Sequence, residues 1–215
     1  MKNYMLALFS IGLVGCASTT APKVEWVAST EFDRFTDITT CSVSTGSLYT
    51  HSNVYTYSNR LYPFIQVVNN ELQVGVKSGG KYKVPVGDVQ LRIDSNKAWI
   101  ISMSETPVNT KPDAPVNAQL DLMTEYAKNL PAEQQKLIAD SYKTALNSTG
   151  QMLSPFTVAT GDKATAILNE MLNGKTLIYR TLGFGPMVPN TEGTTGEFLL
   201  DGSLKIALDK CQIKV

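Results

Sequence analysis

The spacing of apolar residues changes once along this chain, and that change restricts the possible folds more than any other feature. Over residues 24–104, short apolar runs and alternating segments such as Val89, Leu91 and Ile93 predict β-strands. From Val116 onward, apolar residues recur at the spacing of a helix face. A block of strands followed by helices predicts an α+β fold.

We expect the first block to be an antiparallel, sandwich-like meander. Leu48 to Tyr57 predicts one strand, and Asn69-Asn70 predicts a two-residue hairpin turn because Asn tolerates a positive φ. The three prolines between Glu105 and Pro115 predict a linker or an extended loop. The elements expected after it are an inserted helical hairpin at about 113–148, a helix at 162–173, a strand at 176–182, a loop at 183–196, a strand at 197–200 and a helix capped by Ser203. A Gly/Pro-rich loop of that length is either disordered or functional.

The first sixteen residues have the features of an export signal. Lys2 precedes an apolar run, Tyr4 to Val14, that is too short to cross a bilayer, since crossing takes about 20 apolar residues. Leu13-Val14-Gly15-Cys16 resembles the lipobox of bacterial lipoproteins. That resemblance implies a diacylglycerol on the Cys16 sulfur and an acyl chain such as palmitate on its amine, a stable membrane anchor. An ordinary secretory signal with an incidental Cys16 is the alternative.

On the lipoprotein interpretation the chain has three parts. Residues 1–15 are a signal peptide, 16–23 a lipidated tether, and 24–215 one α+β domain. Ala17, not Asp, follows Cys16, so the usual inner-membrane retention signal is missing. We therefore expect the protein at the bacterial outer membrane, on its periplasmic face or at the cell surface.

The three cysteines form an odd set, which usually indicates one unpaired thiol. Lipidation would use Cys16. Cys41 and Cys211 would then lie in an oxidising compartment, and we predict that they form a disulfide. The alternative is a pair of buried free thiols.

The chain is electrically balanced, with 19 basic and 19 acidic residues. A nucleic-acid partner requires a basic face, so none is expected. The sequence predicts no cofactor and no particular oligomeric state.

Short motifs associated with catalysis fail in their context. Gly75 to Lys81 matches Gly-x₄-Gly-Lys, but Tyr82 follows where a phosphate loop needs Ser or Thr. Ser78-x-x-Lys81 contains Gly-Gly, which favours a turn over the helix that the Ser-Lys pair requires. His51 is the only histidine and, with two distant cysteines, lacks zinc-ligand spacing. We predict neither a catalytic residue nor a metal site.

Four polar residues are candidates for binding. Arg92 and Asp94 are predicted to share one strand face, and Arg180 lies on the strand at 176–182. A cross-strand ion pair and the recognition of an anion or peptide are both consistent with this arrangement. His51, on a Tyr/Thr-rich segment, is a candidate wall of a pocket.

Short motifs near both ends of the domain resemble a known family. They are Asp33 to Asp37 before Cys41, Leu91 to Asp94, and Phe198 to Leu204 before Cys211. They are similar to small periplasmic proteins of the type VI secretion accessory and invasion-associated locus B kind. This resemblance implies a β-rich binding or accessory domain and no enzyme. We therefore expect a membrane-anchored module for another envelope component, and the alternative is a periplasmic hydrolase that uses His51 or the Asp33 and Asp37 carboxylates.

Overall fold

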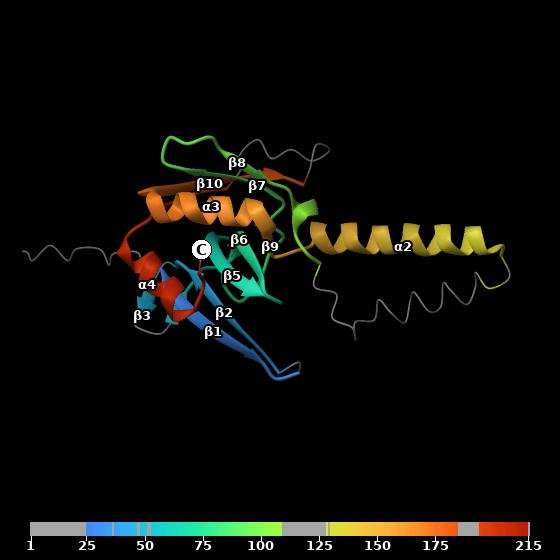
Figure 1. The fold of residues 1–215 in the computed structure, drawn as a ribbon, viewed down its shortest axis with the longest axis horizontal. Coiled ribbons are helices and arrows are strands. Elements are labelled where there is room, and N and C mark those ends of the chain that lie inside the picture. Colours follow the sequence, from blue (N-terminus) through green and yellow to red (C-terminus); the bar gives the residue numbers. More distant parts are fainter. Residues whose placement is uncertain are drawn as a thin grey trace, which may run out of the picture.

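The computed structural model describes residues 25–35, 37–46, 48–50, 53–108, 128, 130–184 and 194–214. These residues form two main antiparallel sheets, a separate two-stranded sheet and several helices, so the fold is α+β, as predicted (Figure 1). The strand and the helix predicted near the C-terminal end of the chain are also present.

The larger sheet has five strands in the order β1-β2-β5-β6-β9. Their bounds are β1 (Val27–Asp33), β2 (Ile38–Ser44), β5 (Leu61–Val68), β6 (Glu71–Ser78) and β9 (Phe156–Ala159). Asn69 and Asn70 join β5 to β6 with φ angles of 51° and 63°, which confirms the predicted hairpin turn.

The smaller sheet has four strands in the order β11-β10-β7-β8. Their bounds are β7 (Asp88–Ile93), β8 (Trp99–Ile101), β10 (Thr176–Gly183) and β11 (Thr195–Leu199). The predicted alternation in β7 is confirmed, because Val89, Leu91 and Ile93 are buried while Arg92 is exposed.

One continuous core joins the inner faces of both sheets with one face of α3 (Gly161–Asn173) and of α4 (Gly202–Lys210). Its largest side chains include Ile65, Val74 and Val76 from the five-stranded sheet, Leu91, Ile93 and Leu177 from the four-stranded sheet, and Ile167, Leu168 and Met171 from α3. Full burial of each such side chain stabilises the fold by about 1.5–3 kcal/mol.

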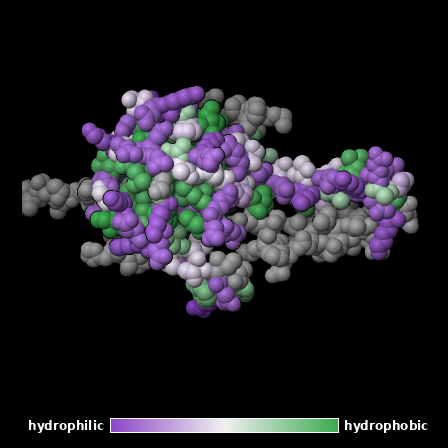
Figure 2. All heavy atoms as spheres, viewed as in Figure 1, coloured by the Kyte–Doolittle hydropathy of each residue, from purple (hydrophilic) through white to green (hydrophobic). Residues whose placement is uncertain are grey.

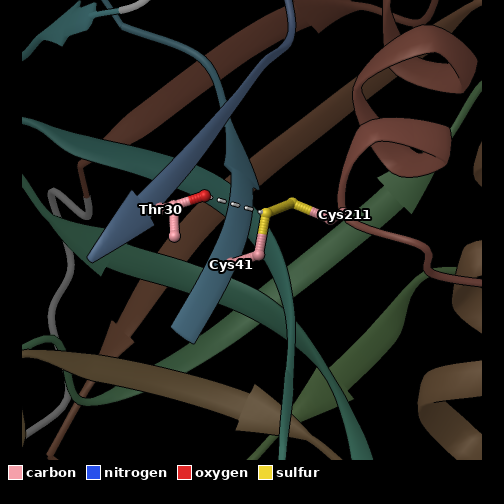
Figure 3. Close-up of a disulfide and its surroundings, with 3 residues drawn as sticks. All are labelled: Thr30, Cys41 and Cys211. Atoms are coloured by element: carbon pink, nitrogen blue, oxygen red, sulfur yellow. Dashed lines mark hydrogen bonds between the residues drawn. A yellow bond between two sulfur atoms is a disulfide. The ribbon is translucent and has the colours of Figure 1, made fainter. Parts of the chain in front are cut away.

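A disulfide joins Cys41 on β2 to Cys211 at the end of α4, as predicted (Figure 3). Two further contacts support this junction, since the backbone N–H of Trp26 donates to Ser203 Oγ at 2.9 Å and its indole N–H donates to the Leu199 carbonyl at 2.8 Å. The α4 end of the chain is therefore fastened to the β1–β2 edge of the larger sheet.

The helix α2 (Ala132–Met152) extends away from both sheets (Figure 1). It has no buried residue, and most of its own visible atoms are coloured as hydrophilic in Figure 2. It corresponds to the second half of the helical hairpin predicted at 113–148 and ends four residues later, while the first half lies outside the described residues. No helix in the described ranges is long and apolar enough to cross a membrane.

Two local predictions were wrong. Leu48 to Tyr57 is not one strand but contains two short strands, β3 (Leu48–Thr50) and β4 (Asn53–Tyr55), which pair antiparallel. The N-cap of α4 is Asp201 rather than Ser203, because the Asp201 carboxylate accepts the Ser203 backbone N–H at 2.9 Å. A short 3₁₀ helix, η1 (Met103–Glu105), follows β8.

Candidate binding face on the four-stranded sheet

The outer face of the four-stranded sheet carries two of the predicted binding residues. Because side chains alternate along a strand, Arg92 on β7 and Arg180 on β10 point away from the buried inner face. In the register, Arg92 lies opposite Ile178, and Arg180 lies opposite Gln90. The two arginines are therefore diagonal neighbours on adjacent strands.

A shallow hollow of about 680 Å³ covers this face. We call it the arginine hollow. Its lining includes both arginines, the exposed Ile178, and residues of β11 such as Thr195 and Glu197. It offers a ligand two cationic groups, one carboxylate and an apolar centre.

One arginine in this hollow is held by a neutral partner. Arg180 Nε donates to Gln90 Oε1 at 2.6 Å, which orients its guanidinium group. Within the described ranges, neither Arg92 nor Arg180 forms an ion pair, so the alternative of a cross-strand salt bridge with Asp94 is not realised. Both guanidinium groups remain available to an external carboxylate or phosphate.

Asp94 has a structural role, unlike the two arginines. It follows β7 at a φ of 48°, and its carboxylate accepts the backbone N–H groups of Lys175 and Thr176, the latter at 2.8 Å. These bonds fasten the β7–β8 turn to the start of β10. Asp94 lies outside the arginine hollow, and its contacts are those of a structural residue.

The other candidates are only partly placed. Cys16, His51 and the middle of the 183–196 loop, residues 185–193, lie outside the described residues. Asp33 and Asp37 border the β1–β2 turn, where Asp33 Oδ1 accepts the Phe35 N–H and Asp37 has a φ of 53°. In the part of the chain that the structure describes, no three side chains of His, Cys, Asp or Glu gather as metal ligands would.

A second hollow, of about 420 Å³, lies on the outer face of the five-stranded sheet and contains Lys77. None of the predicted binding residues within the described ranges lines this hollow. The available signal was Lys77 directly after the apolar run Val74-Gly75-Val76 on β6, where a charged side chain must reach either solvent or a pocket.

The comparisons with known proteins give one structural similarity. No protein-family model matches the chain, and no curated protein matches it in sequence. Invasion associated protein b from Bartonella henselae has a TM-score of 0.39 and 10% sequence identity, over 87% of this chain and 93% of that one.

Proposed function

We propose that this protein is a non-enzymatic binding module, held at the bacterial outer membrane by lipid on Cys16, that recognises an acidic segment of another envelope protein. One observation carries the proposal. Arg92 and Arg180 are diagonal neighbours on an exposed sheet face, and no carboxylate within the described residues neutralises either one.

The geometry of the arginine hollow suits a peptide more than a compact ligand. The hollow is open and shallow. The exposed Ile178 lies between Arg92 and Glu197 in the register, two residues before Arg180 on β10. Arginine binds a carboxylate through two parallel N–H groups, and an adjacent apolar side chain adds surface that is removed from water when the partner binds. An acidic segment with a neighbouring apolar side chain matches both features.

The test is crosslinking in intact envelopes, followed by purification of the full-length protein and mass spectrometry. Wild type is compared with the Arg92→Glu, Arg180→Glu double variant and with Lys97→Glu, which changes an exposed charge in the β7–β8 turn outside the hollow. We expect one partner that is retained by Lys97→Glu and reduced at least about tenfold in the double variant, since charge reversal removes two contacts and adds repulsion.

A Cys16→Ala form tests the tether separately. We expect this form to leave the membrane fraction and to lose the same partner in cells. A partner that binds the double variant as well as wild type would refute the role of the arginine hollow, and membrane retention of Cys16→Ala would refute the lipid anchor.

A further inference from the structure

Strand register gathers polar side chains on the outer face of the five-stranded sheet. Ser29 lies opposite Ser42, and Ser42 lies opposite Gln66, so these three side chains form a row across β1, β2 and β5. Tyr62, Lys77 and Phe156 form a second row across β5, β6 and β9. The rows come from strands far apart in the sequence, and only the assembled sheet places them together.

The hollow of about 420 Å³ between these rows has one wall outside the sheet. We call it the lysine hollow. Residues after β6 form this wall, where the Val84 N–H donates to Ser78 Oγ at 3.0 Å and Lys83 Nζ donates to the Ser78 carbonyl at 3.1 Å. The remaining lining includes the hydroxyl groups of Ser29, Thr40 and Ser42, and the ring of Phe156.

Lys77 is a half-buried cation without a counter-ion. Its Nζ lies 5.1 Å from the centre of the Phe64 ring, and no carboxylate in the described ranges lies within ion-pair distance of it. Burial and, to a lesser extent, the nearby Lys83 lower the pKa of Lys77 to about 8, and Glu31 partly opposes them. The amine is still mostly charged at pH 7, so an ammonium group faces the lysine hollow unpaired.

The hydroxyl groups of the same hollow are also unused. Ser29, Thr40 and Ser42 make no side-chain hydrogen bond within the described part of the chain, whereas the neighbouring Ser44 Oγ donates to the Pro63 carbonyl. The Gln66 amide donates to Gln73 Oε1 at 2.8 Å, which leaves the Gln66 carbonyl oxygen as an acceptor. Hydroxyl and amide groups are partners for the hydroxyl groups of a ligand.

We infer that the lysine hollow binds a small acidic sugar, with Lys77 and Lys83 paired to its carboxylate or phosphate and the Ser29, Thr40 and Ser42 hydroxyls bonded to its hydroxyl groups. Two ammonium groups against the single carboxylate of Glu31 leave the hollow positive. Its volume falls in the range of small-molecule sites, about 300–1,000 Å³, and suits one sugar ring better than a polymer segment. This site lies on the other sheet from the arginine hollow, so the inference does not rest on the proposed function.

Calorimetric titration of the purified protein at pH 7 tests the inference with three probes, namely glucuronate, glucose 6-phosphate and glucose. We expect at least one acidic sugar to bind, and glucose to bind about tenfold more weakly or not at all, because hydrogen bonds to charged groups are the stronger ones. The acidic sugar that binds identifies the anion as a carboxylate or a phosphate. If neither acidic sugar binds at millimolar concentration, or if glucose binds equally well, the inference is wrong.

Three variants locate the binding. Lys77→Met should weaken the acidic sugar at least about tenfold, and Ser42→Ala should weaken it less, because it removes one neutral hydrogen bond. Lys81→Met is the matched control, since Lys81 is exposed and does not line the hollow. Unchanged affinity in Lys77→Met would overturn the assignment. The Arg92→Glu, Arg180→Glu variant should keep wild-type affinity, so failure here and failure of the proposed function are distinguishable.

Discussion

The unpaired ammonium of Lys77 lowers the stability of the folded protein, and the size of this cost follows from its pKa. The pKa is about 8 in the folded state against the usual 10.5, which we take for the unfolded chain. Each pKa unit corresponds to about 1.4 kcal/mol, so the charged lysine destabilises the fold by about 3 kcal/mol at pH 7. Lys77→Met keeps most of the side-chain length and removes this cost.

The sign of the pH dependence is definite. A lysine with a lowered folded pKa binds fewer protons in the folded state between pH 8 and 10.5, so stability rises with pH across that window. At pH 9.5 the folded amine is mostly neutral, and the remaining cost is roughly 1 kcal/mol. The advantage of Lys77→Met over wild type should therefore shrink by about 2 kcal/mol between pH 7 and pH 9.5.

Urea unfolding of both proteins at pH 7 and pH 9.5 measures this change, with Lys81→Met as the control. Glu31 and Lys83 are the charged groups near Lys77, and both remain in the variant. Their contributions largely cancel when the variant is compared with wild type at each pH. An equal free-energy difference at the two pH values would refute the account of Lys77 as a desolvated cation.

Three further perturbations have defined outcomes. Replacing Cys211 with Ser opens a loop of 170 residues and should lower the free energy of unfolding by up to about 5 kcal/mol, according to the chain-entropy model. The urea midpoint should therefore fall. Reductant should lower the midpoint of wild type in the same way and should leave that of the variant unchanged. Asp94→Ala should destabilise the fold by about 1–3 kcal/mol in the same assay, because two backbone N–H groups lose their acceptor, and it should leave partner binding unchanged. A Cβ at Gly75 would collide with the Thr157 carbonyl on β9, so Gly75→Ala should lower the free energy of unfolding by about 1–3 kcal/mol. Amide hydrogen exchange should become faster first along the β6–β9 pair. A variant as stable as wild type would contradict the close approach of these two strands.

Local patterns predicted the parts of this fold that depend on local physics. The alternation of Val89, Leu91 and Ile93 indicated a strand with one buried face, and Asn69-Asn70 indicated a turn, because both signals arise from neighbouring residues. The segment from Leu48 to Tyr57 was misjudged for the same reason. Its residues favour strands, but strand propensity does not show where a strand reverses and pairs with itself.

The candidate sites show the same division between local and long-range information. The alternation along each strand predicts that Arg92 and Arg180 both face outward. It does not predict that they lie next to each other, because that depends on the pairing of β7 with β10. Asp94 was a candidate for binding or for a cross-strand ion pair, and the hydrogen bonds that it accepts come from residues about 80 positions later in the chain. The lysine hollow needed the register of five strands, including the distant β9, and no single segment of the sequence contains that information.

The Cys41–Cys211 bond also sets an order of events during biosynthesis. A nascent chain presents Cys41 long before Cys211, so the β1–β2 hairpin exists with a free thiol until 170 more residues have been made. Its closing contacts, from Trp26 to Leu199 and Ser203, are equally late. The junction between the β1–β2 edge and α4 therefore forms only after the last helix has been made, and a free Cys41 thiol marks any chain whose synthesis or export stopped early. An oxidase or chaperone that reacts with such thiols would distinguish unfinished molecules from finished ones by that single group.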